Sequence, residues 1–196
     1  MLRASLKMSW SLSLKTVKFN IAAINRCTEA EGPFKRLAIW FQGCDRRCAG
    51  CCNPKMLEFK PVNILNGSEL MKIIVEAKTQ FNIEGVTFLG GEPTLQQGLA
   101  ELAQAIRLAD LGIVLFTGKQ VDELPKKLMA AVDLIVDGGF EQDKKETTRN
   151  LIGSTNQRVI HMTERYRLQE KWFYTKRPKQ ADINVLDALF ITGDMI

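Results

Sequence analysis

The amino-acid sequence predicts an α/β domain built from βα units around a parallel sheet. Short runs of β-branched and aromatic residues alternate with amphipathic helical stretches at a spacing of about 25 residues. The chain has 196 residues, 45% of them apolar, which is the length of one domain and enough for a proper core. Periodicity alone fits both an open doubly wound sheet and an incomplete β/α barrel.

The first part of the chain is expected to contain three strands and a helix. A possible strand covers residues 17–24, and the apolar run 37–42 is predicted to be a buried strand. Residues 68–81 form a helix, because Ser68 is a good N-cap and apolar residues then recur at helical spacing. The β-rich run 85–89 is the next strand.

The second part continues the alternation. Two more helices are predicted, at 95–110, weakened by Gly98, and at 120–131, interrupted by Pro125. Three strands are predicted at 112–117, 132–137 and 157–162. The lone histidine, His161, ends an apolar run and is expected to be a core residue with its hydrogen bonds satisfied.

Charge and composition divide the chain into three parts. Residues 1–16 are basic and free of acids and are expected to be a flexible tail, although such a start also resembles an organelle transit peptide, and Met8 is an alternative initiator. Residues 17–162 form the core domain, and the basic, aromatic segment 163–196 completes or flanks it. The net charge of +5 is concentrated at the two ends.

Two classes of partner are not expected. The chain has no run of 18 apolar residues, so we expect no membrane span. Basic and aromatic residues alternate over 165–179, a pattern that can bind nucleic acid or an acidic protein. A solvated face with its aromatic rings in the core is the favoured interpretation, so nucleic acid is an unlikely partner.

Polar, glycine-rich segments follow four of the predicted strands. They are residues 43–53, 90–94, 117–119 and 137–140. The carboxyl ends of parallel strands meet at one edge of the sheet, where α/β proteins bind their ligands. The sequence therefore predicts that these four segments line a single pocket.

Four of the five cysteines lie within residues 44–52. Thiols bunched on a short loop would close only tiny rings, so a metal or redox site in a reducing compartment is favoured over a disulfide framework. Cys44, Cys48 and Cys51 have the spacing C-x3-C-x2-C and can face one iron-sulfur cluster. Three ligands on a four-iron cubane would leave one iron open, as catalytic metal sites require.

The remaining cysteines leave an alternative open. The side chains of Cys51 and Cys52 are expected to diverge, so Cys52 is interpreted as a bystander, and Cys27 as a small buried hydrophobe. A zinc site that uses Cys44, Cys48, Cys51 and either Cys52 or Cys27 is the alternative.

The cysteine loop and a second motif together resemble a known family. "GCDRRCAGC" is followed, after a predicted strand, by "GGEP", and this combination resembles the radical S-adenosylmethionine enzymes. With "LFTGK", "VDGGF" and "GSTNQRVI" it resembles, over residues 20–161, the activating enzymes of anaerobic ribonucleotide reductase and their short relatives. The resemblance implies an incomplete β/α barrel of radical SAM type.

The resemblance also implies a mechanism and a set of site residues. Cys44, Cys48 and Cys51 would hold a [4Fe-4S] cluster, and the methionine part of S-adenosylmethionine would bind the fourth iron. Reductive cleavage of the cofactor would give a 5′-deoxyadenosyl radical. The implied cofactor-binding residues are Gly90, Gly91, Glu92, Thr117, Gly118 and Asn156, with Glu92 contacting the methionyl ammonium. Asn156 and Gln157 would form pocket wall rather than transfer protons.

The expected substrate is a larger protein on which the chain installs a glycyl radical. That role implies an electron donor such as flavodoxin or ferredoxin and a cytoplasmic location. A radical SAM enzyme that modifies a small molecule or a peptide is an alternative within the class. A non-catalytic iron-sulfur or zinc module is an alternative of a different class.

Overall fold

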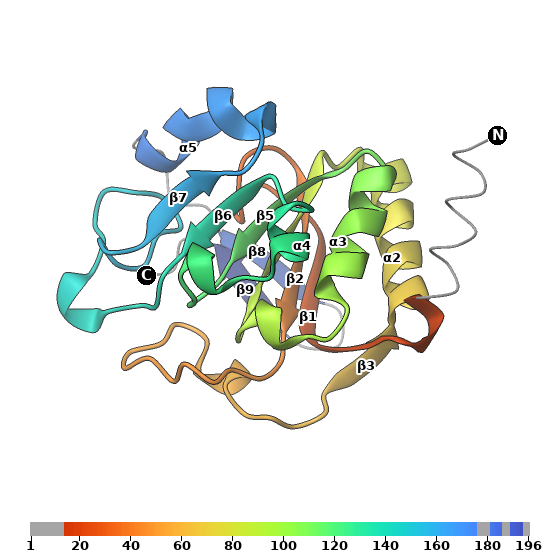
Figure 1. Ribbon diagram of the computed structural model, residues 1–196, viewed down its shortest axis with the longest axis horizontal. Coiled ribbons are helices and arrows are strands. Elements are labelled where there is room, and N and C mark those ends of the chain that lie inside the picture. The colour runs from red at the N-terminus through yellow and green to blue at the C-terminus, as the bar shows by residue number, and fades with distance from the viewer. Residues whose placement is uncertain (1–13, 176–180, 186–188, 194–196) are drawn as a thin grey trace.

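The computed structural model describes residues 14–175, 181–185 and 189–193. They form a seven-stranded sheet in the order β3-β1-β2-β4-β5-β6-β7 and a two-stranded sheet of β8 and β9 (Figure 1). The strands are β1 (Lys18–Thr28), β2 (Arg36–Phe41), β3 (Asn63–Asn66), β4 (Gly85–Gly90), β5 (Gly112–Phe116), β6 (Leu134–Asp137), β7 (Arg158–His161), β8 (Ala181–Val185) and β9 (Leu189–Gly193).

The centre of the large sheet is parallel and its flanks are antiparallel. Strands β2, β4, β5 and β6 run parallel, as the βα pattern predicts, and the predicted α/β fold is confirmed. β1 pairs antiparallel with β2, β3 with β1, and β7 with β6. The connection from β1 to β2 is too short for a parallel crossover, which explains the antiparallel pair. The sequence analysis did not predict β3.

The helices are α2 (Gly67–Phe81), α3 (Leu99–Leu108), α4 (Lys126–Met129) and α5 (Glu170–Tyr174). Short 3₁₀ turns are η1 (Pro54–Met56), η2 (Pro93–Leu95), η3 (Val121–Glu123), η4 (Gln142–Lys144) and η5 (Glu164–Gln169). Helices α2, α3 and α4 lie together on one side of the sheet (Figure 1). None of the helices in the described ranges is long and apolar enough to cross a bilayer.

Three helix starts differ from the prediction. The N-cap of α2 is Asn66 rather than Ser68, because the Asn66 side chain and Glu69 form a reciprocal capping box. The predicted helix 95–110 begins only at Leu99, since Gly98 adopts φ 78° and interrupts the helical geometry. Pro125 divides the predicted helix 120–131 into η3 and α4.

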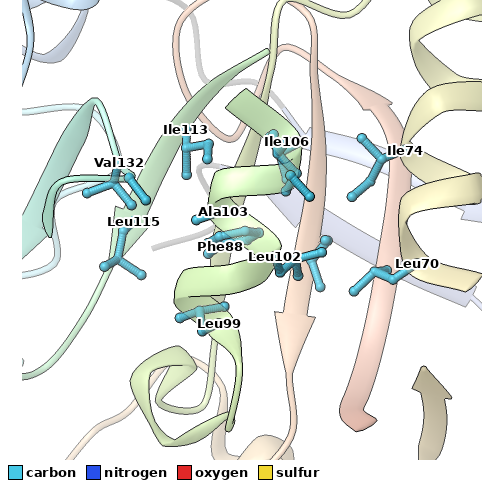
Figure 2. Close-up of a cluster of buried hydrophobic side chains, with 14 of the residues drawn as sticks. Leu70, Ile74, Phe88, Leu99, Leu102, Ala103, Ile106, Ile113, Leu115 and Val132 are labelled. Carbon is cyan, nitrogen blue, oxygen red and sulfur yellow. The ribbon is translucent and has the colours of Figure 1, made fainter. Parts of the chain in front are cut away.

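The main core lies between the helices and the sheet. Figure 2 shows Leu70 and Ile74 of α2 facing Leu102 and Ile106 of α3 above the strands. Phe88 of β4 is fully buried beneath them. This packing fixes the helices on one face, which leaves the other face of the sheet for a cavity.

The opposite face is covered in part by the C-terminal segment. Val114, Leu134 and Val136 pack in a second buried cluster with Tyr166 and Phe173. The expectation that aromatic rings of the basic segment are tucked into the core is confirmed for Tyr166 and Phe173, both fully buried. Residues 176–180, 186–188 and 194–196 of the segment lie outside the described residues, as do residues 1–13 of the predicted tail. The prediction of a flexible tail is wrong for its last residues, because Leu14 is 2% exposed and packs in the main core.

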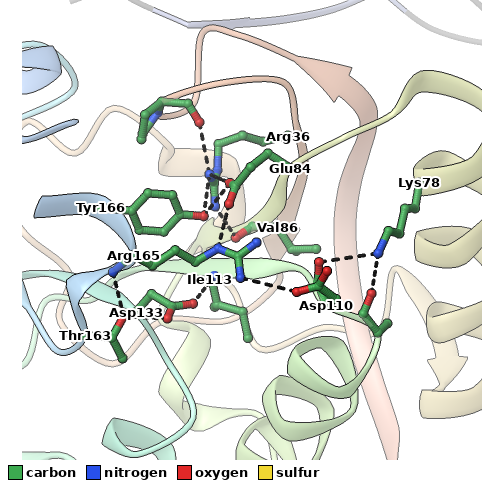
Figure 3. A network of polar contacts seen from close by, with 12 residues as sticks. Arg36, Lys78, Glu84, Val86, Asp110, Ile113, Asp133, Thr163, Arg165 and Tyr166 are labelled. Carbon is green, nitrogen blue, oxygen red and sulfur yellow. Dashed lines mark hydrogen bonds and ion pairs between the residues drawn. The ribbon is translucent and has the colours of Figure 1, made fainter. Parts of the chain in front are cut away.

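A buried arginine joins this segment to the amino ends of the strands. Arg36 donates hydrogen bonds to Glu84 (3.1 Å), Thr87 Oγ1 (2.7 Å) and the Tyr166 hydroxyl (3.0 Å) (Figure 3). The Tyr166 hydroxyl in turn donates to Glu84 at 2.6 Å, and Arg165 donates to the same carboxylate at 2.7 Å. Burial raises the pKa of Tyr166, so this hydroxyl stays protonated and donates. The network locks η5 to the edge of the sheet that lies away from the cysteines.

The expectation for His161 is wrong in one respect. Both ring nitrogens are buried and have no hydrogen-bond partner within the described residues. His161 pairs with Leu134 of β6, and the residue before Leu134 is Asp133. The Asp133 carboxylate accepts its hydrogen bonds from the Ile113 amide (2.9 Å) and the Thr163 hydroxyl (2.7 Å) instead. Burial lowers the pKa of His161.

Candidate functional site

A cavity of about 950 Å³ lies at the carboxyl edge of the parallel strands. Its volume falls in the range of small-molecule and cofactor sites. All four segments predicted to share a pocket contribute to its walls, so that prediction is confirmed. The contributing residues include Cys44, Cys48, Gly91, Glu92, Thr117 and Gly138.

The floor of the cavity is an apolar part of the sheet. Trp40 of β2 and Leu89 of β4 pack in a small buried cluster, with Phe116 of β5 against it, and all three line the cavity. These residues lie on the face that α2 and α3 leave uncovered. The surroundings therefore exclude water from one side of any bound group, which strengthens electrostatic interactions there.

The cysteine loop leaves β2 and is held by its own backbone. The Gly43 amide donates to the Met56 carbonyl at 2.9 Å, and the Cys44 amide donates to the Leu57 carbonyl at 3.2 Å. The buried Gln42 side chain donates to the Glu58 carbonyl at 2.7 Å. These bonds close the loop on itself, so the cysteines are presented by a fixed backbone.

The three predicted ligands share the cavity wall. Cys44 is buried, Cys48 and Cys51 are half-buried, and all three are free thiols. No group of three histidine, cysteine or carboxylate side chains in the described part of the chain is arranged to hold a single metal ion. A cubane binds each thiolate at a different iron, so its ligands stand farther apart than those of one ion.

The polypeptide around these sulfurs suits a cluster. Burial raises the pKa of Cys44, while the backbone amides of Arg46 and Arg47 hydrogen-bond to its sulfur and act against that rise. The Asn53 amide donates to Cys51 Sγ at 3.4 Å. Amide donors to sulfur stabilise thiolates and tune the reduction potential of an iron-sulfur cluster, so the residues present fit this group.

Cys52 departs from its predicted geometry. Its thiol hydrogen-bonds with that of Cys51, and this bond lowers the pKa of Cys51 to about 6. The two side chains were expected to diverge along an extended backbone, but the chain bends at Cys52. Cys52 is an exposed residue of the cavity wall. Cys27 instead packs against the main core from β1.

Gly90 and Gly91 bring two loops together. A side chain at Gly91 would place Cβ 2.3 Å from the Gly43 carbonyl oxygen, and one at Gly90 would place Cβ 2.4 Å from the Phe41 nitrogen. The Glu92 amide then donates to the Gly43 carbonyl at 2.9 Å. Gly91 is thus required by the close approach of the cysteine loop, and Gly90 by the close approach of the end of β2, in addition to any approach of a ligand.

Glu92 is a fully buried carboxylate that joins the ends of β4 and β5. Its Oε1 accepts hydrogen bonds from the Thr94 amide (3.1 Å), the Thr94 hydroxyl (2.6 Å) and the Thr117 hydroxyl (2.8 Å). Its Oε2 accepts from the Gly118 amide at 2.8 Å. The structure therefore brings Glu92, Thr117 and Gly118 together, as the resemblance implies.

The two oxygens of Glu92 differ in what they can still accept. Each carboxylate oxygen has about two lone-pair sites. Oε1 already receives three donors, whereas Oε2 receives one from the residues described. Because Glu92 also lines the cavity, Oε2 is the atom available to a cationic amine.

The segment after β6 is fixed by two amide side chains. Gln157 donates to the Gly138 carbonyl at 2.9 Å and accepts from the Gly153 amide at 2.9 Å. Asn156 donates to the Gly139 carbonyl at 2.8 Å, and its Oδ1 is buried without a donor among the described residues. Gln157 lines the cavity as predicted, whereas the prediction for Asn156 is wrong, because Asn156 is not among the lining residues and its amide is instead bound to the Gly139 carbonyl. A buried orphan acceptor is typical of a site that a ligand or water completes.

A wall that the sequence analysis missed covers one side of the cavity. Residues 145–153, between β6 and β7, all line it. The buried Glu146 accepts from Arg149 at 2.5 Å, and Arg149 also donates to the Gln157 carbonyl at 2.8 Å. Asn150 anchors the wall to α5, because its amide donates to the Phe173 carbonyl at 2.8 Å and its side chain to the Trp172 carbonyl at 2.5 Å. The C-terminal segment thus supports the site.

Comparisons with known proteins agree with this geometry. A family described as a 4Fe-4S single cluster domain matches residues 30–160. Relatives named anaerobic ribonucleoside-triphosphate reductase-activating protein include one from Escherichia coli K12, 32% identical over 151 residues (67% of this chain and 91% of that protein). One from Enterobacteria phage T4 is 25% identical and spans 74% of this chain and 96% of that protein. The structure of QueE from Escherichia coli has a similar fold, with a TM-score of 0.53, 16% identity, and 67% of this chain and 64% of QueE covered.

Proposed function

The chain belongs to the 4Fe-4S single cluster domain family and to the anaerobic ribonucleoside-triphosphate reductase-activating proteins, and we propose that it is a radical SAM enzyme that activates a glycyl-radical enzyme such as anaerobic ribonucleotide reductase. One observation carries the proposal. Three free cysteines and a buried glutamate with an open acceptor site converge on one cavity from different strands of the sheet.

We assign Cys44, Cys48 and Cys51 as the ligands of a [4Fe-4S] cluster. Their spacing, their shared cavity and the amide donors beside Cys44 and Cys51 support this assignment. With Cys52 outside the ligand set, one iron of the cluster remains open to a cofactor.

We assign Glu92, with Gly90, Gly91, Thr117 and Gly118, to the methionyl end of S-adenosylmethionine. Glu92 Oε2 has acceptor capacity for the methionyl ammonium. The Thr117 hydroxyl and the Gly118 amide donate to the Glu92 carboxylate and hold it in place. Asn156 is not among the residues that line the cavity, so we assign it to the cofactor only through its orphan Oδ1, next to the Gly139 carbonyl to which its amide donates at 2.8 Å.

When bound, the reduced cluster and S-adenosylmethionine supply a radical that abstracts a hydrogen atom. The chain's own contribution is to hold both groups against the apolar floor of Trp40, Leu89 and Phe116 and to keep water away. Hydrogen abstraction by a radical needs no acid or base, so none of the carboxylates that line the cavity, Glu31, Glu92 and Glu146, has to transfer a proton. The substrate would be a glycine of a partner protein.

The reaction also needs an electron and a compartment. We propose a reduced flavodoxin or ferredoxin as the donor, because the cluster must be reduced before it acts. We propose a cytoplasmic location, because clustered free thiols persist in a reducing compartment.

The test is anaerobic reconstitution of the cluster followed by dithionite and S-adenosylmethionine. Wild-type protein should form 5′-deoxyadenosine, and Cys48→Ala should lose both the cluster absorbance and the product. Cys52→Ala is the matched control, one residue beyond a predicted ligand, and should retain both. If Cys52→Ala also loses the cluster, the ligand assignment is wrong. If wild-type protein with a demonstrably reduced cluster forms no 5′-deoxyadenosine above background, the enzymatic function fails.

A further inference from the structure

We propose that the protein substrate docks on an apolar strip beside the cavity, formed by Phe59, Pro61, Val62 and Ile64. The inference rests on the proposed function, since an activase must bring the backbone of another protein to its own cavity. The strip is the surface on which that protein would be held.

The strip concentrates exposed apolar side chains in one short segment. Phe59 is 66% exposed, Val62 45% and Ile64 47%, and Pro61 is exposed as well. Other exposed apolar residues, such as Phe34, Val75, Leu108 and Leu168, lie in four different segments of the chain. Single apolar residues on a surface are ordinary, whereas a contiguous group marks an interaction site.

The strip is held in place before any partner arrives. The Asn20 side chain donates to the Lys60 carbonyl at 2.7 Å and accepts from the Val62 amide at 2.9 Å. Gln42 fixes the preceding Glu58 carbonyl. A surface ordered in advance loses little conformational entropy on binding, which favours docking.

The strip continues directly from the cavity wall. Met56 and Leu57 line the cavity and accept the backbone bonds of Gly43 and Cys44. Two residues after Leu57, the Phe59 ring lies against Gly43: a Cβ added to Gly43 would be 3.0 Å from Phe59 Cδ1. Figure 1 shows the segment after β2 running along the edge of the sheet towards β3. A protein seated on the strip would therefore have its adjoining residues at the mouth of the cavity.

β3 adds backbone recognition to the strip. It is the end strand of the seven-stranded sheet and, among the strands that the structure describes, pairs with β1 alone. Leu65 packs against the main core, so the neighbouring Ile64 faces the opposite side of the sheet, where the cavity lies. An edge strand with an exposed apolar side chain accepts an extended apolar segment as an added strand. The occupant we infer is such a segment, close in sequence to the glycine of the glycyl-radical protein.

The test uses Val62→Lys with Ile64→Lys in the reconstituted full chain. Radical formation on the anaerobic ribonucleoside-triphosphate reductase of the same organism is measured against reductase concentration. The apparent KM for the reductase should rise about tenfold or more, the effect of losing a binding hot spot, with kcat unchanged. Formation of 5′-deoxyadenosine without reductase should stay at the wild-type rate.

Two further variants separate the causes. Val75→Lys with Leu108→Lys changes two residues of α2 and α3 that are 46% and 47% exposed, so it matches the test variant in exposure and charge. Its KM should equal that of the wild type. Val62→Thr with Ile64→Thr removes apolar contact without adding charge and should raise KM in the same direction by a smaller factor.

The outcomes distinguish this proposal from the proposed function. If the wild type forms the glycyl radical and the strip variants match it in KM, the docking surface is wrong and the function stands. If the strip variants lose self-association while KM for the reductase is unchanged, a second copy of the chain is the occupant and the proposal is overturned. If the wild type forms 5′-deoxyadenosine but no radical on the reductase, the activase function and the docking surface fail together.

Discussion

Replacing Glu92 by glutamine tests the site at its most connected residue. The carboxylate is fully buried and accepts four hydrogen bonds, three at Oε1 and one at Oε2 from the Gly118 amide at 2.8 Å. Glutamine keeps one oxygen, which can serve the three donors from Thr94 and Thr117. Its NH₂ group must then face the Gly118 amide, so two donors meet and one bond is lost.

The size of the effect follows from this count. Loss of one hydrogen bond to a charged acceptor, with a buried amide left unpaired, costs about 1.5–3 kcal/mol of unfolding free energy. The same NH₂ group would face the ammonium of S-adenosylmethionine. Losing that charge-assisted bond should weaken cofactor binding by roughly tenfold to a hundredfold.

Urea unfolding of the cluster-free protein measures the stability, and equilibrium dialysis of labelled S-adenosylmethionine on the reconstituted protein measures the affinity. Glu84→Gln is the matched control, because Glu84 also accepts three strong bonds, from Arg36, Arg165 and Tyr166, but lies at the other edge of the sheet. It should lose stability and keep the wild-type affinity. An unchanged affinity in Glu92→Gln would refute the assignment of Glu92 to the cofactor.

Three further predictions concern other parts of the site. Gly91→Ala should prevent retention of the cluster, measured by iron content, because its Cβ would lie 2.3 Å from the Gly43 oxygen, whereas Gly139→Ala, whose nearest contact would be 3.7 Å, should retain it. Asn150→Ala should cost about 1–2 kcal/mol in urea unfolding, since α5 loses two side-chain donors, and an unchanged midpoint would contradict the anchor. Burial raises the pKa of Glu146, but the Thr148 amide and Arg149 outweigh it and lower the pKa to about 2. Its stabilisation should be present above about pH 4.5 and be lost as pH falls towards 2, and Glu146→Gln should flatten this acid-unfolding slope; an equal slope would contradict the pairing.

Much of the fold could be predicted from the sequence because the central strands and the outer helices have strong periodicity. β2, β4, β5 and β6 are buried on both faces and read as continuous apolar runs. β3 has four residues, half of them asparagine, so it carries no such pattern. The antiparallel pairing of the flanking strands depends on partners that are distant in sequence, which local periodicity does not reveal.

The site divides in the same way. The cysteines and Glu92 lie in short contiguous motifs, so the sequence alone places them together. The wall 145–153 is polar and resembles a solvated loop; its order depends on Asn150 capping a helix that begins 20 residues later. The role of Gly91 was only partly predictable. Its close approach to Gly43 arises because β2 and β4 pair in parallel, so that the loops that follow the two strands meet, and the sequence alone does not show which strands are neighbours.

The most direct test of the activase function follows one hydrogen atom. The reductase is labelled with glycine deuterated at its α-carbon and incubated anaerobically with the reduced, reconstituted protein and S-adenosylmethionine. Mass spectrometry of the 5′-deoxyadenosine should show one deuterium taken from the glycine, together with a radical signal on the reductase. Unlabelled 5′-deoxyadenosine, formed at the same rate with and without the reductase, would contradict the function proposed for this chain.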